Sequence, residues 1–98
     1  MPCQHAPLVR CLHAMKIGII HEISDPESFT ERGTDMVAST PEGIKNLQAC
    51  PAEDLSTCTC IWEATSVEEL SEFVDTSLGD ASTQTYFSIL EEQAIGLP

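Results

Sequence analysis

Basic residues are scarce in this sequence. Its 98 residues include four Lys and Arg against sixteen Asp and Glu, which gives a formal net charge of −12. No Lys or Arg follows Lys45. Nucleic acids and anionic membranes attract proteins through cations that neutralise their phosphates, so this deficit argues against both as partners. We expect a protein that binds neither nucleic acid nor membrane.

Long apolar runs are absent as well. The most apolar stretch near the N-terminus, Leu8 to Ile20, is interrupted by Arg10, His13 and Lys16. A secretory signal needs an unbroken apolar region, and a membrane-spanning helix needs about 20 apolar residues in a row. The five cysteines are odd in number and lack the regular spacing of secreted disulfide scaffolds. We therefore expect a cytoplasmic protein whose thiols are mostly reduced.

Motifs for catalysis and for cofactor binding are also missing. The sequence has no glycine-rich phosphate loop, no nucleophile elbow and no Cys-x-x-Cys pair. Two Cys-x-His units, Cys3 with His5 and Cys11 with His13, contain residue types that bind Zn²⁺. Structural zinc sites usually have longer ligand spacing on tight turns, so we expect residues 1–14 to be a loosely ordered extension instead. We expect no cofactor and no metal site.

What the sequence does contain, from Met15 onward, is a clear series of strand and helix patterns. Apolar and β-branched residues predict strands at 16–23, 44–50, 58–64 and 83–90, and apolar residues at helical spacing predict one helix after each of the first and third strands. This order predicts an α+β domain over residues 15–98 with the ferredoxin-like βαββαβ fold. Right-handed crossovers then place both helices on one face of a four-stranded antiparallel sheet.

Both predicted helices begin at recognisable capping residues. Ser66 and Glu69 have the spacing of a capping box at the start of the second helix. The first helix has two candidate caps, because either Ser24 or Asp25 can cap a helix that has Pro26 in its first turn. The sequence leaves these two alternatives open.

The strands differ in what their faces carry. Four isoleucines make the strand at 16–23 nearly continuous in apolar character, which is typical of an inner strand covered on both faces. Alternation places Cys58, Cys60 and Trp62 on one face of their strand, and Cys50 joins them only if it lies opposite Cys58. A register shift of one residue removes Cys50 from this group, so its face stays open. Buried free cysteines commonly pack as small hydrophobic residues, which is the role we expect here.

Several short motifs resemble a group of small bacterial and archaeal proteins related to the dimeric α/β-barrel branch of the ferredoxin-like superfamily. The matching segments cover about Met15 to Pro98 and read Lys16-Ile-Gly-Ile-Ile-His21, Asp25-Pro26, Pro41-Glu-Gly-Ile-Lys45, Cys60-Ile-Trp-Glu-Ala64, Tyr86-Phe87 and Ala94-Ile-Gly-Leu-Pro98. The resemblance implies a homodimer in which the sheet face without helices meets a second subunit, often around a pocket. The superfamily contains cofactor-free oxygenases, haem enzymes and simple binding modules, so the resemblance does not select an activity.

His21 is the residue with the most chemical interest, because it lies near the end of the first strand and a histidine can act as a general base. Trp62, Glu63 and Tyr86 are candidates to line a ligand pocket with it. Two functional hypotheses follow. The first is a small homodimeric ligand-binding or structural module. The second is a cofactor-independent or metal-dependent, oxygenase-like enzyme that uses His21 in a pocket on the open sheet face.

Overall fold

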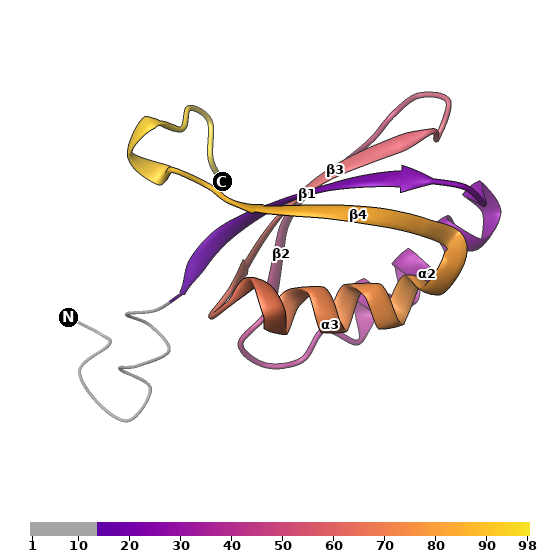
Figure 1. Ribbon diagram of the computed structural model, residues 1–98, viewed down its shortest axis with the longest axis horizontal. Coiled ribbons are helices and arrows are strands. Elements are labelled where there is room, and N and C mark those ends of the chain that lie inside the picture. Colours follow the sequence, from indigo (N-terminus) through magenta and orange to yellow (C-terminus); the bar gives the residue numbers. More distant parts are fainter. Residues whose placement is uncertain (1–13) are drawn as a thin grey trace.

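The computed structural model describes residues 14–98 and confirms the βαββαβ order (Figure 1). The expectations for residues 1–13, including the zinc candidates, lie outside this range. The elements are β1 (Met15–Ile23), α2 (Pro26–Ala38), β2 (Lys45–Pro51), β3 (Thr57–Ala64), α3 (Val67–Leu78), the 3₁₀ turns η1 (Gly79–Ala81) and η2 (Glu91–Gln93), and β4 (Ser82–Ser88). No helix in this range is long and apolar enough to cross a membrane.

The four strands form one antiparallel sheet in the order β2-β3-β1-β4. Both helices lie on the same side of the sheet, as right-handed crossovers require (Figure 1). The other side carries neither of these helices, and the C-terminal turn η2 lies at its edge, where Glu91 pairs with Lys16 at 3.3 Å. The expectation that the first strand is covered on both faces is therefore wrong for the single chain, because Ile20 on this side is 41% exposed.

Local capping chemistry explains where the helices begin and end. Asp25, rather than Ser24, caps α2, because its carboxylate accepts a hydrogen bond from the Ser28 N–H at 3.1 Å. Ser66 caps α3 by accepting from the Glu69 N–H at 3.0 Å. Gly79 follows α3 with a φ of 58°, a backbone conformation that glycine adopts without strain.

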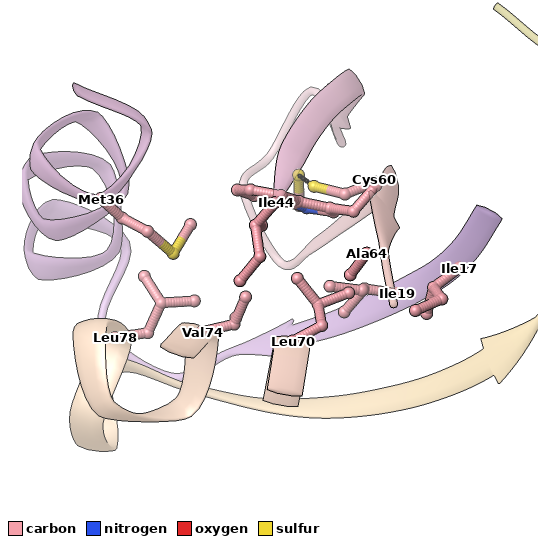
Figure 2. Packing of buried hydrophobic residues seen from close by; sticks show 11 residues of the cluster. Ile17, Ile19, Met36, Ile44, Cys60, Ala64, Leu70, Val74 and Leu78 are labelled. Carbon is pink, nitrogen blue, oxygen red and sulfur yellow. Dashed lines mark hydrogen bonds between the residues drawn. The ribbon is translucent and has the colours of Figure 1, made fainter. Parts of the chain in front are cut away.

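The hydrophobic core lies between the sheet and α3. Leu70, Val74 and Leu78 point from α3 toward the sheet, where they meet Ile17 and Ile19 of β1 (Figure 2). Five fully buried aliphatic side chains of this size contribute about 1.5–3 kcal/mol each relative to solvent exposure. This cluster makes α3 the helix that is tied most firmly to the sheet.

The strand register assigns each side chain to one face. Ile17 lies opposite Trp62, Ile19 opposite Cys60, and His21 opposite Cys58, so all six side chains lie on the helix-covered face. Their neighbours along the chain lie on the uncovered face. The last strand ends at Ser88, two residues before the predicted end, because the chain turns into η2 after Leu90.

Candidate functional site

A groove of about 710 Å³ lies on the helix side of the sheet, between α2 and the β2–β3 hairpin. Its volume is in the range of roughly 300–1,000 Å³ that small-molecule sites have. The sheet and the hairpin contribute His21, Asn46, Ala49, Pro51, Leu55, Cys58, Cys60 and Trp62, and α2 contributes Phe29, Thr30, Gly33, Thr34, Met36 and Val37. None of these residues is Asp, Glu, Lys or Arg.

The groove exists because the backbone of α2 packs mainly against α3 and η1, while α2 meets the strands through side chains such as Phe29 and Met36. Arg32 holds this arrangement by donating from Nη1 to the Leu78 carbonyl at 2.9 Å and pairing with Asp80 at 3.5 Å. A cation at the C-terminal end of α3 also interacts favourably with the helix dipole. A Cβ added to Gly33 would meet no atom within 4 Å, which shows how much space lies beside α2.

His21 faces this groove, not the open sheet face on which the sequence-based hypothesis placed its pocket. The side chain is 1% exposed and makes an edge-on contact with the Phe29 ring at 5.3 Å between centroids. The physical reason is alternation: His21 is in phase with the buried Ile17 and Ile19, and those residues point toward the helices. The alternative of an enzyme that uses His21 stays a prediction, with the groove beside α2 as the surface that His21 lines.

A chain of hydrogen bonds fixes the protonation of the His21 ring. Asp75 on α3 accepts from Nε2 of Gln84 at 2.8 Å and from the Tyr86 hydroxyl at 2.6 Å. The Gln84 amide therefore turns its oxygen away from Asp75, and this oxygen accepts from Nδ1 of His21 at 3.1 Å and from the Ser82 hydroxyl. Since an amide oxygen only accepts, the proton is on Nδ1, and Nε2 of the neutral ring carries a lone pair.

Burial shifts the pKa values of two groups in this chain of hydrogen bonds, His21 and Tyr86. Desolvation lowers the pKa of His21 below its usual value of 6.5, although the hydrogen bond from Nδ1 to Gln84 and the Asp75 carboxylate oppose the shift. His21 is therefore neutral at pH 7. Burial, together with the hydrogen bond to Asp75, raises the pKa of Tyr86, so its hydroxyl keeps its proton and donates.

Two buried polar atoms find no hydrogen-bond partner within residues 14–98, namely Nε2 of His21 and Nε1 of Trp62. Both side chains line the groove, and Trp62 is fully buried against Phe73. The Trp62 N–H faces the sulfur of Cys60, which is only a weak acceptor. The groove is thus apolar, and Nε2 of His21 is the acceptor in its wall that no group within residues 14–98 uses.

The sequence suggested that Trp62, Glu63 and Tyr86 line one pocket with His21, and the structure places these three residues in different surroundings. Trp62 shares the groove, whereas Tyr86 lies on the same face but beyond Gln84, bonded to Asp75. Glu63 points to the opposite face of the sheet, where it pairs with Lys16 at 3.6 Å. The four predicted residues do not form one pocket, because Glu63 is out of phase with Trp62 on the same strand.

The register also decides the question of the three thiols. Cys50 lies opposite Thr59 and is exposed, while Cys58 and Cys60 are buried with their sulfurs 3.8 Å apart. Burial raises the pKa of Cys58, and it raises the pKa of Cys60 to about 12, so both remain protonated thiols. Within the described residues no group of three or more His, Cys, Asp or Glu side chains is placed to hold a metal ion.

Sequence reasoning missed the α2 wall of the groove and the hairpin tip. The apolar stripe of Phe29, Met36 and Val37 can be seen in the sequence. Its helical spacing is the same whether the stripe faces the core or a groove, so the sequence does not distinguish the two. Only Met36 is buried, whereas Val37 is 50% exposed. Leu55, at the hairpin tip, has a φ of 59°, which is strained for a non-glycine residue and keeps a large apolar side chain at the groove.

Neither a protein-family model, nor a curated protein, nor a solved structure matches this chain. Its function is therefore argued from the groove and from the uncovered sheet face.

Proposed function

We propose that this protein is a binding module that holds a small, uncharged and mainly apolar molecule in the groove between α2 and the β2–β3 hairpin. The observation that carries the proposal is the contrast between the groove and the rest of the molecule. The chain has a net charge of −12, yet no Asp, Glu, Lys or Arg lines a groove of about 710 Å³. A neighbouring hollow of about 660 Å³ is lined by Glu27, Glu31 and Asp35, so the absence of charge is particular to the groove.

Binding is favoured over catalysis by the chemistry of the walls. Nε2 of His21 is a proton acceptor, but an acid–base mechanism also needs a second reactive group near the same substrate atom. Among the described residues, the groove offers only Thr and Asn side chains, an indole N–H and thiols held in their protonated form. These groups suit the orientation of a ligand better than its chemical conversion.

The test uses Trp62, the only tryptophan of the chain, as a reporter of groove occupancy. Titration with p-xylene is expected to change the Trp62 fluorescence in a saturable manner. Gly33→Leu fills the groove from α2 and should abolish this change, whereas the matched control Gly33→Ala adds a single methyl group and should retain it. A wild-type protein that shows no saturable response, or a Gly33→Leu variant that responds equally, would contradict the proposal.

We further propose that a second copy of the chain covers the sheet face that has no helices. Ile20 and Phe87 on this face are 41% and 47% exposed, and Ile61 lies between them and β2. The Phe87 ring lies directly over Gly18, where an added Cβ would clash with the ring. The centre of the face is therefore a continuous apolar area, of the kind that marks an interaction surface.

Charge supports a second copy as the occupant. The uncovered face carries Lys16 and Lys45 together with Glu22 and Glu63, and Glu91 pairs with Lys16 at its edge, so its net charge is small within a strongly acidic chain. Lys45, Glu63 and Lys16 occupy one row across three strands, and Lys16 pairs with Glu63. Two copies can meet through this face without the repulsion that their other surfaces would produce. The resemblance to dimeric α/β-barrel proteins implies the same contact.

Sedimentation equilibrium tests this contact. The wild-type protein is expected to sediment with the mass of two chains, and Phe87→Glu is expected to sediment as one chain because it places a charge at the apolar centre. Thr76→Glu adds the same charge on the exposed side of α3 and should remain a dimer. Circular dichroism confirms that each variant is folded. A monomeric wild-type protein, or a dimeric Phe87→Glu variant, would exclude this interface.

A further inference from the structure

The His21 ring offers the groove a hydrogen-bond acceptor that no group within residues 14–98 uses. Its Nδ1 is turned toward Gln84 on β4, so Nε2 lies at the tip of the side chain, on the helix side of the sheet. The side chain is among those that line the groove, but it is 1% exposed and Nε2 is itself buried, so a ligand reaches Nε2 as the Phe29 ring that packs against His21 moves aside. A buried polar atom without a partner destabilises the fold, so a molecule that donates to Nε2 removes an existing penalty.

The ring cannot turn this acceptor into a donor without breaking the chain of bonds behind it. Asp75 accepts from both Gln84 and Tyr86, and this fixes which end of the Gln84 amide faces the histidine. A proton on Nε2 of the neutral ring would leave two acceptors, Nδ1 and the Gln84 oxygen, facing each other. The arrangement therefore holds Nε2 as an acceptor and selects ligands that carry a donor.

The remaining walls limit the ligand further. The net charge of −12 repels anions, and the groove has no carboxylate among its described residues to pair with a cation. Its walls are side chains such as Phe29, Met36, Val37 and Leu55, which suit an apolar body. An uncharged donor attached to an apolar body is a hydroxyl group, as in a phenol or an alcohol, or an N–H group, as in an indole.

We propose that the groove recognises an uncharged apolar molecule through a hydroxyl or N–H group that donates a hydrogen bond to Nε2 of His21. His21 is then the residue that sets the class of ligand, and Asp75 and Gln84 are positioning residues that hold its tautomer. This inference rests on the proposed binding function and adds the chemical group that the site selects.

The test compares p-cresol with p-xylene, which have nearly the same shape but differ in a hydroxyl group. The dissociation constants of both are measured through Trp62 fluorescence in the wild-type protein and in His21→Phe, which keeps an aromatic ring beside Phe29. The preference for p-cresol over p-xylene is expected to fall about three- to tenfold in the variant, the size of one net hydrogen bond. An unchanged preference would overturn the assignment of His21.

Nitrogen NMR of the wild-type protein provides a second readout that does not depend on a variant that folds well. The His21 Nε2 resonance is expected at the position of an unprotonated imidazole nitrogen, and it should move upfield with p-cresol but not with p-xylene. A resonance that p-cresol leaves unmoved while Trp62 reports binding would overturn this inference alone. If neither compound binds, the proposed binding function fails and this inference fails with it.

Discussion

His21 combines three properties that rarely occur together in one side chain: near-complete burial, a fixed tautomer and an unused acceptor atom. Each follows from its immediate neighbours. Burial against Phe29 removes water, the Gln84 oxygen takes the Nδ1 proton, and no group of the described chain reaches Nε2. A residue of this kind links stability to pH as well as to ligand binding.

The direction of the pH effect follows from the lowered pKa of His21. In the unfolded chain the ring titrates near 6.5, whereas in the folded protein it binds a proton only at lower pH. Between these two values the unfolded state binds more protons, so the free energy of unfolding falls as the pH decreases from about 6.5 toward the folded pKa. Below the folded pKa this contribution is fully lost.

Urea denaturation between pH 7.5 and pH 5 checks this expectation in the wild-type protein and in His21→Phe. The wild-type protein should lose more stability over this interval than the variant, because the variant has no buried imidazole to protonate. Groups that do not interact with His21 contribute equally to both curves and cancel in the comparison. Parallel curves for the two proteins would show that His21 is not buried as a neutral ring.

At the scale of elements, α2 decides whether the groove exists. The two helices follow equivalent strands in the chain, yet α3 packs its apolar stripe into the core while α2 packs mainly on α3. Arg32 holds α2 there through a hydrogen bond to the Leu78 carbonyl and an ion pair with Asp80. The width of the groove therefore depends on a contact at the far side of α2, away from the ligand.

Replacement of Arg32 tests this dependence. Arg32→Met keeps the aliphatic stem but removes both polar contacts, and we expect the free energy of unfolding to fall by about 1 kcal/mol, since the side chain is partly exposed. Binding of p-xylene should weaken as α2 shifts. Arg32→Lys keeps the charge without the planar group, so its free energy of unfolding and its binding of p-xylene should lie between those of the wild-type protein and Arg32→Met. Urea denaturation and Trp62 fluorescence measure both effects, and unchanged binding in Arg32→Met would show that α2 is held by packing alone.

At the scale of the whole molecule, the excess of negative charge opposes folding. Twelve net negative charges within a radius of gyration of 14.0 Å repel one another, and at low ionic strength salt screens them little. The Debye length is about 30 Å at 0.01 M salt and about 10 Å at 0.1 M, so repulsion across the molecule is suppressed over this range.

Thermal unfolding in increasing NaCl measures this effect. We expect the midpoint temperature to rise between 0.01 M and 0.5 M NaCl, with most of the increase below about 0.2 M, where screening changes fastest. Sucrose at matched osmolality is the control, because it stabilises by exclusion from the protein surface without screening charge. A midpoint that does not change with NaCl, or that falls, would show that the negative charges are already neutralised in the folded protein.

Local patterns were sufficient for the order and ends of most elements. The α3 helix was predictable from Ser66 to Gly79, because its N-terminal capping residue, its apolar stripe and the glycine that ends it all lie within one short segment. For α2, the sequence offered Ser24 and Asp25 equally, and the choice depended on the hydrogen bonds that Ser24 makes to the carbonyls of Asp80 and Ala81, far along the chain. A side chain with a distant partner cannot be assigned from its neighbours in sequence.

The sequence by itself determined the βαββαβ order and the net negative charge, because propensity, period and charge are properties of single segments and of composition. Only the tertiary structure decided that Cys50 leaves the buried face, that His21 points toward α2, and that α2 packs mainly against α3 and η1. These facts depend on register and on packing between distant segments. A shift of one residue in the register moves a side chain to the opposite face of the sheet.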